Sequence, residues 1–288
     1  MKTFDPYMPI KKVPLFTDDG QMQSRMYAIK AEVPIKNKDG AVTMQPYECG
    51  TVSEQFMLIP NADVRDFNDD LLKVVPGNWE IGKEMFDGHK YMMTQYCKDG
   101  FATHELEVGD TISLGIMWRN AYDMTRSLSF DLFLNVLSCT NGMTHNQWFN
   151  RFRFKHTPNN SNWADVLKEA GDTIVNASNS VPELVDNLNR LNNIKVNKTD
   201  DIRSIRNILD KDTLGYTQWG KVIDRFVSQD PANNNHHTLW DFTQACTHTF
   251  WNSGKSQDKV NSWADLTTNE KCVRKLTSIK QLSAVAEA

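Results

Sequence analysis

The chain has 288 residues, of which 40% are hydrophobic and 10% aromatic, a composition typical of a globular protein with a large core. No stretch approaches the roughly 20 apolar residues of a membrane span, and the N-terminal residues contain no apolar signal region. The five widely spaced cysteines argue against a disulfide framework. We therefore expect a soluble, cytoplasmic protein with no membrane partner.

The charge is distributed unevenly along the chain. The formal net charge is −4, but residues 1–110 carry 12 basic and 18 acidic side chains, whereas residues 111–160 carry five basic and two acidic ones. Local charge decides whether a surface attracts phosphate, because such attraction acts mainly within a Debye length of about 8–10 Å. The segment 111–160 is therefore the part most suited to an anionic ligand.

The first 110 residues are expected to form strands and turns around a helix. Residues 26–34 and 46–59 are patterned as strands, and Lys38-Asp39-Gly40 is typical of a hairpin turn. Residues 64–75 form an amphipathic pattern that ends at Pro76-Gly77, which predicts a helix. A second hairpin is predicted from Lys90 to Leu106, with its turn at Lys98-Asp99-Gly100.

The middle of the chain is the most informative part. Residues 111–120 predict an apolar strand, and the sequence Cys139-Thr140-Asn141-Gly142 predicts a turn. In residues 148–156, phenylalanines alternate with basic residues, which is the period-two pattern of a half-buried strand. This strand would present its basic residues on one face.

The remainder is patterned as helices. Helices are expected over residues 162–170, 181–191, from 199, 213–227 and 238–251, with a weak helix or frayed tail over 279–288. The sequence therefore predicts an α+β protein with an antiparallel, β-rich N-terminal half and a helical C-terminal half. We expect a domain over residues 1–160 and a helical region over residues 161–288 that packs on it.

Several short motifs occur in a fixed order over roughly residues 45–160, and a further one follows near the C-terminus. They are Gly50-Thr51-Val52-Ser53-Glu54-Gln55-Phe56, Gly109-Asp110, Asn120-Ala121-Tyr122-Asp123, Cys139-Thr140-Asn141-Gly142-Met143, Lys155-His156-Thr157 and Thr238-Leu239-Trp240-Asp241-Phe242-Thr243-Gln244-Ala245-Cys246-Thr247. Taken together, the motifs resemble a family of phage- and plasmid-borne proteins known as "phage/plasmid-like", whose shared region is domain of unknown function 932. The last motif looks like the family's C-terminal signature.

The chain departs from the family pattern at two places. The family usually follows its Asn-x-x-Asp motif with Gly-Ser, where this chain has Met124-Thr125. It usually carries an arginine three residues before its cysteine, where this chain has Val136. Roles carried over from the family through these positions do not transfer directly.

The resemblance points toward mobile-element DNA metabolism, because some phage families with a sheet backed by helices are single-strand annealing proteins. This link rests on analogy of fold and gene context. It implies a protein that binds single-stranded DNA without ATP, promotes annealing or recombination, and assembles into a homo-oligomer. In a phage, the compartment would be the host cytoplasm.

The basic strand supplies candidate residues for this function. Alternate residues on a strand repeat every ~6.6 Å, so a row of cations could follow the backbone of an extended nucleic acid while an aromatic side chain stacks on a base. The alternative is a solvated strand face neutralised by acidic neighbours. The candidate nucleic-acid-binding residues are Arg119, Arg126, Trp148, Arg151, Arg153 and Lys155.

No motif points to catalysis, a cofactor or a metal. The sequence has no Gly-rich phosphate loop, no CxxC pair and no recognised histidine spacing for zinc. Buried polar residues in turns explain the remaining motif residues most simply. We assign this structural turn role to Asn120, Asp123, Cys139, Asn141 and Gly142.

Two other functions remain open. A non-enzymatic protein that binds a host or phage protein, for example to block a defence system, is favoured by the acidic residues 1–110, since an acidic surface repels DNA. A structural virion component is the third possibility.

Overall fold

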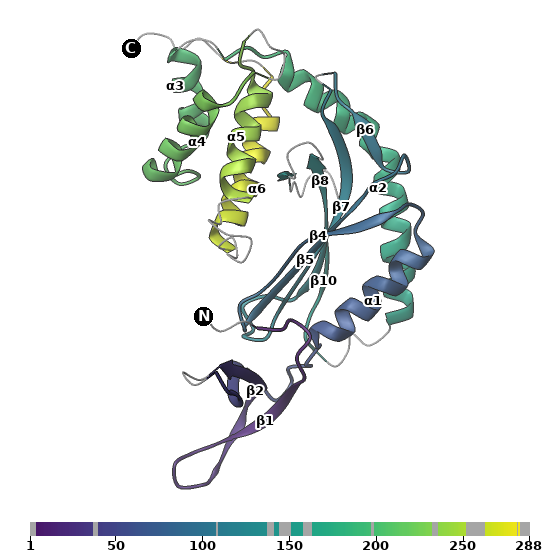
Figure 1. Ribbon diagram of the computed structural model, residues 1–288, viewed down its shortest axis with the longest axis vertical. Coiled ribbons are helices and arrows are strands. Elements are labelled where there is room, and N and C mark those ends of the chain that lie inside the picture. Colours follow the sequence, from purple (N-terminus) through teal and green to yellow (C-terminus); the bar gives the residue numbers. More distant parts are fainter. Residues whose placement is uncertain are drawn as a thin grey trace. The chain divides into compact units, whose positions relative to one another are not determined.

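The computed structural model describes residues 4–36, 40–107, 109–136, 141–143, 151–157, 163–196, 199–231, 236–251, 263–280 and 282. Strands precede most of the helices, which confirms the α+β class (Figure 1). The strands are β1 (Ile10–Phe16), β2 (Met22–Lys36), β3 (Val42–Ser53), β4 (Trp79–Phe86), β5 (Lys90–Cys97), β6 (Thr103–Glu105), β7 (Thr111–Ala121), β8 (Leu128–Val136), β9 (Asn141–Met143) and β10 (Arg151–Phe154). The helices are α1 (Asn61–Val74), α2 (Trp163–Asn192), α3 (Thr199–Ile208), α4 (Tyr216–Ser228), α5 (Leu239–Trp251) and α6 (Trp263–Thr277).

The chain divides into two compact units. The first comprises residues 1–95, 116–131 and 151–175, and the second comprises residues 96–115, 132–150 and 176–288. The chain passes between the units several times, through strands β5, β7 and β8 and helix α2. The boundary that we predicted near residue 160 stays a prediction about independent domains.

A three-stranded antiparallel sheet, in the order β1-β2-β3, occupies the N-terminal part of the first unit (purple in Figure 1). The predicted hairpin between β2 and β3 is confirmed, with Lys36 opposite Val42, and Gly40 has a φ of 88° that favours glycine. β1 was not predicted from the sequence. Its residues Ile10–Phe16 alternate between partly buried and exposed positions without a strong apolar run.

The second sheet has seven strands, in the order β10-β8-β7-β5-β4, with β6 on β7 and β9 on β8. The predicted hairpin from Lys90 to Leu106 is wrong, because β6 pairs with β7 and not with β5. A tight turn explains this pairing. Leu106 N–H donates to Asp110 O at 2.8 Å, Gly109 has a φ of 83°, and the chain therefore returns along Thr111–Ser113.

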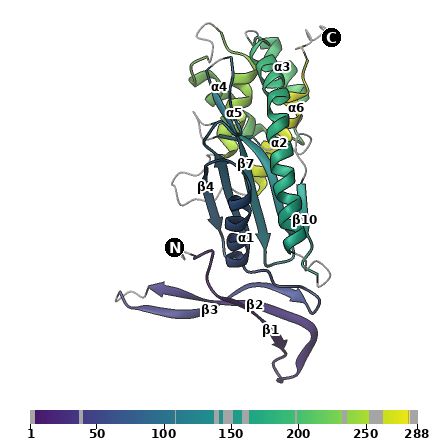
Figure 2. The same ribbon diagram turned by 90° about the vertical axis from the view of Figure 1, so that its right-hand side faces the viewer.

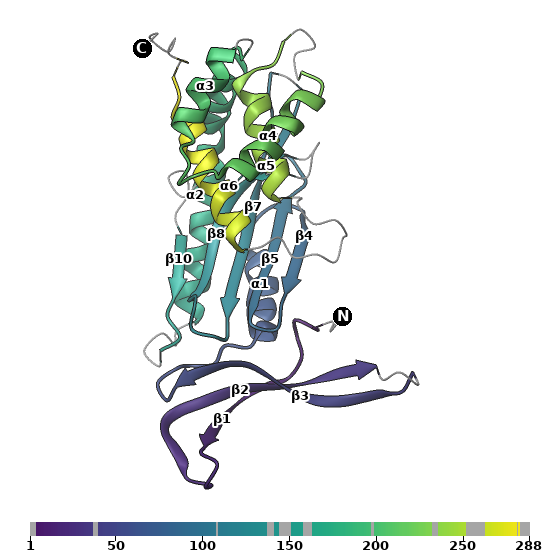
Figure 3. The ribbon, with the colours of Figure 1, turned by 90° about the vertical axis from the view of Figure 1, so that its left-hand side faces the viewer.

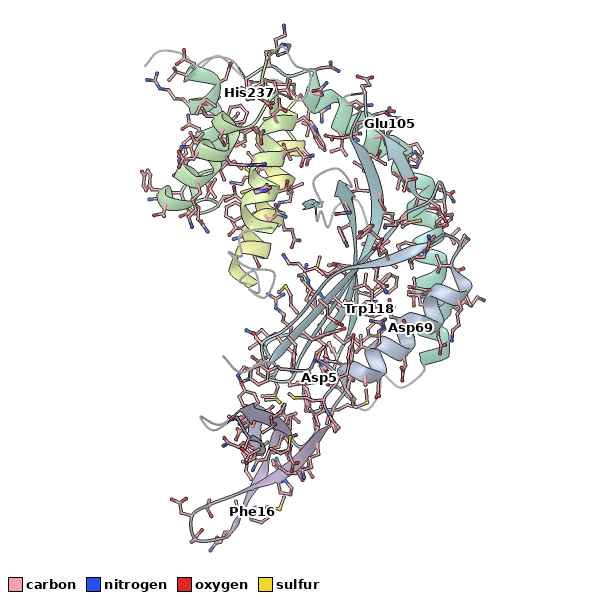
Figure 4. All side chains as sticks on the ribbon, viewed as in Figure 1. Asp5, Phe16, Asp69, Glu105, Trp118 and His237 are labelled. Atoms are coloured by element: carbon pink, nitrogen blue, oxygen red, sulfur yellow. The ribbon has the colours of Figure 1, made fainter. Side chains whose placement is uncertain are left out.

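In the first unit, α1 covers one face of the strands (Figure 2). Trp118 of β7 points toward α1 (Figure 4), where its Nε1 donates to Asn68 Oδ1 at 2.8 Å and its ring contacts Phe67 edge-on. Phe130 of β8 and Phe152 of β10 continue this aromatic layer. Seen from the opposite side, the strands lie in front of α1 (Figure 3). Alternation along β7, β8 and β10 places Arg119, Asp131 and Arg153 on that opposite face.

Helix α2 corrects the prediction of separate helices over residues 162–170 and 181–191. One helix of 30 residues spans both, with Pro182 inside it. Its buried residues recur every three or four positions without a break, so a single apolar stripe runs along the helix and holds it together across the proline. This stripe consists of Ala170, Ile174, Ala177, Val181, Leu184, Leu188 and Leu191.

The second unit contains the helices α3–α6. Helices α3, α4 and α5 fall where the sequence predicts them, whereas α6 was missed. Trp240 of α5 is fully buried and donates from Nε1 to Asp110 Oδ2 at 3.0 Å, which joins two of the motifs quoted above. Within the described residues, no helix has both the length and the hydrophobicity that a membrane span requires.

Candidate nucleic-acid interface

Motifs that are far apart in the sequence meet around the loop between β7 and β8. Gly50 of β3 lies against this loop so closely that a Cβ atom there would stand 2.2 Å from Tyr122 O and 2.8 Å from Asp123 Cα. Only glycine fits this approach. The Gly50–Phe56 motif and the Asn120–Asp123 motif are therefore in direct contact.

Asn120 fastens the end of β7 to the segment that leads into α1. It is fully buried, and its Nδ2 donates to Ile59 O and to Asn61 Oδ1, both at 2.9 Å. Its Oδ1 accepts the backbone N–H of Ala121 at 3.0 Å. Asn61 N–H in turn donates to the Tyr122 hydroxyl at 2.8 Å. These bonds fix the direction in which the chain leaves β7.

Asp123 organises the loop itself. Its Oδ1 accepts the Thr125 backbone N–H at 3.1 Å and the Thr125 hydroxyl, and its Oδ2 lies 3.9 Å from Lys90 Nζ. Met124 between them has a φ of 59°, a conformation that costs a side-chain-bearing residue about 1–2 kcal/mol. The resemblance predicts glycine at this position, so the chain keeps the conformation that glycine would favour while carrying a side chain.

A pocket of about 370 Å³ lies beside this loop on the face opposite α1. We call it the cationic pocket. Four of its side chains are basic and three carry hydroxyl groups: Lys90, Arg119, Arg126 and Arg153, with Thr125, Ser127 and Ser129. Hydroxyl and guanidinium donors arranged in this way are suited to hold a phosphate.

Two carboxylates partly neutralise the cationic pocket. Asp123 lies near Lys90, and Asp131 Oδ2 lies 3.5 Å from Arg119 Nε. Arg119 is only 6% exposed, so its guanidinium forms part of the floor of the pocket and is tied to Asp131. Within the described residues, the pocket thus brings four basic groups together with these two carboxylates.

The basic strand expected over residues 148–156 is described from Arg151 onward. Among the described strands, β10 lies at the edge of its sheet and pairs with β8, with Arg153 opposite Ser129. Arg153 and Lys155 are exposed, whereas Phe152 and Phe154 are partly buried, as the period-two pattern predicts. Within the described residues, Arg153 has no ion-pair partner.

Other predicted residues are placed in part or not at all. For Arg151 the structure gives the backbone, which pairs with Asp131, and Asn141 and Gly142 lie in β9 opposite Val136 and Asn135. Trp148 and Cys139 lie outside the described residues.

A second pocket, of about 300 Å³, adjoins the first and shares Arg126 and Ser127 with it. We call it the Phe56 pocket. Its further lining residues come from the end of β3, from the β7–β8 loop and from the segment after β10: Ser53, Gln55, Phe56, Met124, Lys155, His156 and Thr157. Phe56 and His156 stack with ring centroids 4.4 Å apart, and Met57 N–H donates to His156 O at 2.9 Å.

A family model described as Domain of unknown function (DUF932) matches residues 48–279, which is most of the chain. The chain belongs to this family. The match includes the residues of both pockets and of every motif given above, and it begins just before Gly50. No curated protein and no solved structure matches the chain. The DUF932 description states no activity.

The cysteines that the structure describes are buried, and its described residues form no cluster of metal-ligating side chains. The described residues contain no group of three His, Cys, Asp or Glu side chains that could hold a metal ion. Cys49, Cys97, Cys246 and Cys272 are all buried, and burial raises the pKa of Cys49 to about 12. A thiol with such a pKa is not a nucleophile near neutral pH.

Several residues of the cationic pocket could not be identified from the sequence. Lys90 was assigned to a hairpin strand and not to a site. It lines a pocket with Arg119 because β5 lies beside β7, and that pairing is not visible in the sequence. Ser127 and Ser129 were seen only as polar positions of a strand. The alternation of serines with Leu128 and Phe130 was the one available signal that their hydroxyls share the face of Arg153.

Proposed function

We propose that this DUF932 protein binds single-stranded DNA without ATP, through the cationic pocket and the exposed basic residues at the β10 edge. The convergence of four basic side chains from β5, β7, the β7–β8 loop and β10 on one pocket carries the proposal. A solvated strand face would present the basic residues of one strand, whereas basic residues from four separate segments that line one concave site are suited to bind an anion.

An extended strand suits the geometry better than an isolated anion. Arg153 in the cationic pocket and Lys155 in the Phe56 pocket are two residues apart, a spacing of about 6.6 Å along a strand. Successive phosphates of an extended backbone could therefore meet successive cations. Among the described strands, none pairs with the free edge of β10.

Affinity should depend on salt in proportion to the number of phosphates that are neutralised. Arg126, Arg153 and Lys155 lie on this path, and each contact with a single strand contributes about −0.7 to the slope of log K against log salt. We expect a slope of about −2. Bases that are not held by the protein stay open for pairing, which would permit annealing of a phage or mobile-element strand.

The test is fluorescence anisotropy with labelled oligo-dT and with a duplex of the same length, each titrated with salt. The proposal predicts tighter binding of the single strand with the slope given above, and self-association of the protein on the strand. A strand-pairing assay then tests annealing. Absence of binding to either oligonucleotide at low salt would refute the proposal.

A second candidate function is binding of a host or phage protein without catalysis. The N-terminal sheet favours it, because four large apolar side chains on β1, β2 and β3 are exposed, and exposed apolar side chains can mark protein interfaces. They are Phe16 and Met22, which pair at one end of β2, and Val42 and Met44, which pair with its other end. Pull-down from host lysate with wild-type protein and with a Val42→Ser, Met44→Ser variant tests the second pair, since a partner held by Val42 and Met44 would be lost from the variant.

A further inference from the structure

The Phe56 pocket differs in chemistry from the cationic pocket that it adjoins. Phe56, Met124 and the His156 ring give it apolar surface, and Gln55 and the Ser53 and Thr157 hydroxyls supply neutral hydrogen-bonding groups. Lys155 also lines it and would meet the next phosphate of the strand. A nucleobase has this same combination of an apolar face and a polar edge. The phosphate of the same nucleotide would lie on the other side of Arg126 and Ser127, which line both pockets.

The wall of the Phe56 pocket includes the ring of His156. His156 is 7% exposed and stacks on Phe56, and its Nδ1 lies 2.9 Å from Met57 O, which identifies Nδ1 as the protonated nitrogen. Nε2 is then an acceptor, and it has no hydrogen-bond partner among the described residues. Nε2 is buried, so His156 contributes to the pocket as a flat ring stacked on Phe56 and not as an open hydrogen-bonding group.

Met124 supplies a second, independent observation. It is 50% exposed, lines the Phe56 pocket and has a left-handed φ that the Asp123–Thr125 bonds hold in place. A strained backbone with an exposed apolar side chain costs stability, and such strain concentrates at ligand-binding positions. A thioether over an aromatic ring is a favourable contact, so Met124 is suited to cover a bound base.

We propose that the Phe56 pocket receives one nucleobase of the single strand whose phosphate lies in the cationic pocket. The protein would then grip one nucleotide by phosphate and base together, and hold that base out of pairing while its neighbours stay open. This inference rests on the proposed function and adds to it a dependence of affinity on the base.

The experiment compares labelled oligo-dT with an abasic oligonucleotide of the same length and charge. Wild-type protein should bind the abasic strand about tenfold more weakly, since stacking of a base contributes affinity that the backbone cannot replace. Met124→Gly and Gln55→Ala should each narrow this difference, and Met124→Gly should at the same time raise Tm because glycine accepts the left-handed φ. Met44→Gly is the control, since Met44 is 57% exposed and lies about 30 Å along β3 from Ser53.

The outcomes separate this inference from the proposed function. Equal affinity of wild-type protein for both strands would overturn the base pocket and leave the phosphate site intact. No binding of either strand would overturn both. Displacement of the oligonucleotide by thymidine monophosphate at a similar concentration would assign the two pockets to a free nucleotide, and would overturn the proposal for a strand.

Discussion

Gly50→Ala should destabilise the first unit strongly, because a Cβ atom at this position has no space. It would stand 2.2 Å from Tyr122 O, 2.7 Å from Tyr122 C and 2.8 Å from Asp123 Cα. All three atoms belong to the backbone, and Asn120 and the Tyr122 hydroxyl hold that backbone in place. No side-chain rotation can relieve the clash, so we expect the upper part of the overpacking range, about 3 kcal/mol.

Urea unfolding followed by tryptophan fluorescence measures this effect. Gly220→Ala is the matched control, because Gly220 lies within α4 with nothing within 4 Å of its would-be Cβ. Alanine there should stabilise the protein by up to about 1 kcal/mol. If Gly50→Ala unfolds within about 0.5 kcal/mol of wild type, which is the range of neutral surface changes, the close contact between β3 and the β7–β8 loop is wrong.

Three further predictions concern buried polar groups of the first unit. Arg119→Ala should lower the free energy of unfolding in urea by about 3 kcal/mol, because it leaves the Asp131 carboxylate buried without that cation. A change near zero would show that the ion pair is not formed. Asn68→Ala should cost about 1–3 kcal/mol by the same assay, since Trp118 Nε1 loses its acceptor. The additional replacement of Trp118 by phenylalanine should recover part of that loss. If it recovers none, the hydrogen bond between Asn68 and Trp118 is contradicted. Burial lowers the pKa of His156 below its ordinary 6.5, so the unfolded chain binds this proton more readily. The resulting stability is present above about pH 6.5 and is lost as pH falls through the folded pKa. The drop in Tm between about pH 7.5 and pH 5 should therefore be smaller in His156→Gln than in wild type. An equal drop would contradict the burial of a neutral His156.

Features that depend on neighbours in the sequence could be predicted from it. The alternation of Phe152 and Phe154 with Arg153 and Lys155 was visible because a strand places successive side chains on opposite faces. The β2–β3 hairpin was visible because Gly40 takes a φ that other residues disfavour. The α+β class follows from the same kind of local pattern.

Features that depend on pairing between distant segments could not be predicted. β6 pairs with β7 through a turn at Leu106–Asp110, but the sequence is equally compatible with a hairpin between β5 and β6. The cationic pocket depends on the position of β5 beside β7, since β5 brings Lys90 next to the β7–β8 loop. Arg119 could be named as a basic residue, but its burial against Asp131 is a consequence of the β7–β8 pairing.

Charge reversal at the cationic pocket tests the central claim most directly. The measurement is the affinity of labelled oligo-dT for an Arg126→Glu, Arg153→Glu variant. A Lys211→Glu, Lys221→Glu variant is the control, because it makes the same change in net charge at exposed residues of the second unit. The account predicts that the pocket variant loses binding by at least about 100-fold at low salt while the control binds within about threefold of wild type. Equal affinity of the two variants would show that DNA, if it binds at all, does so elsewhere on the protein.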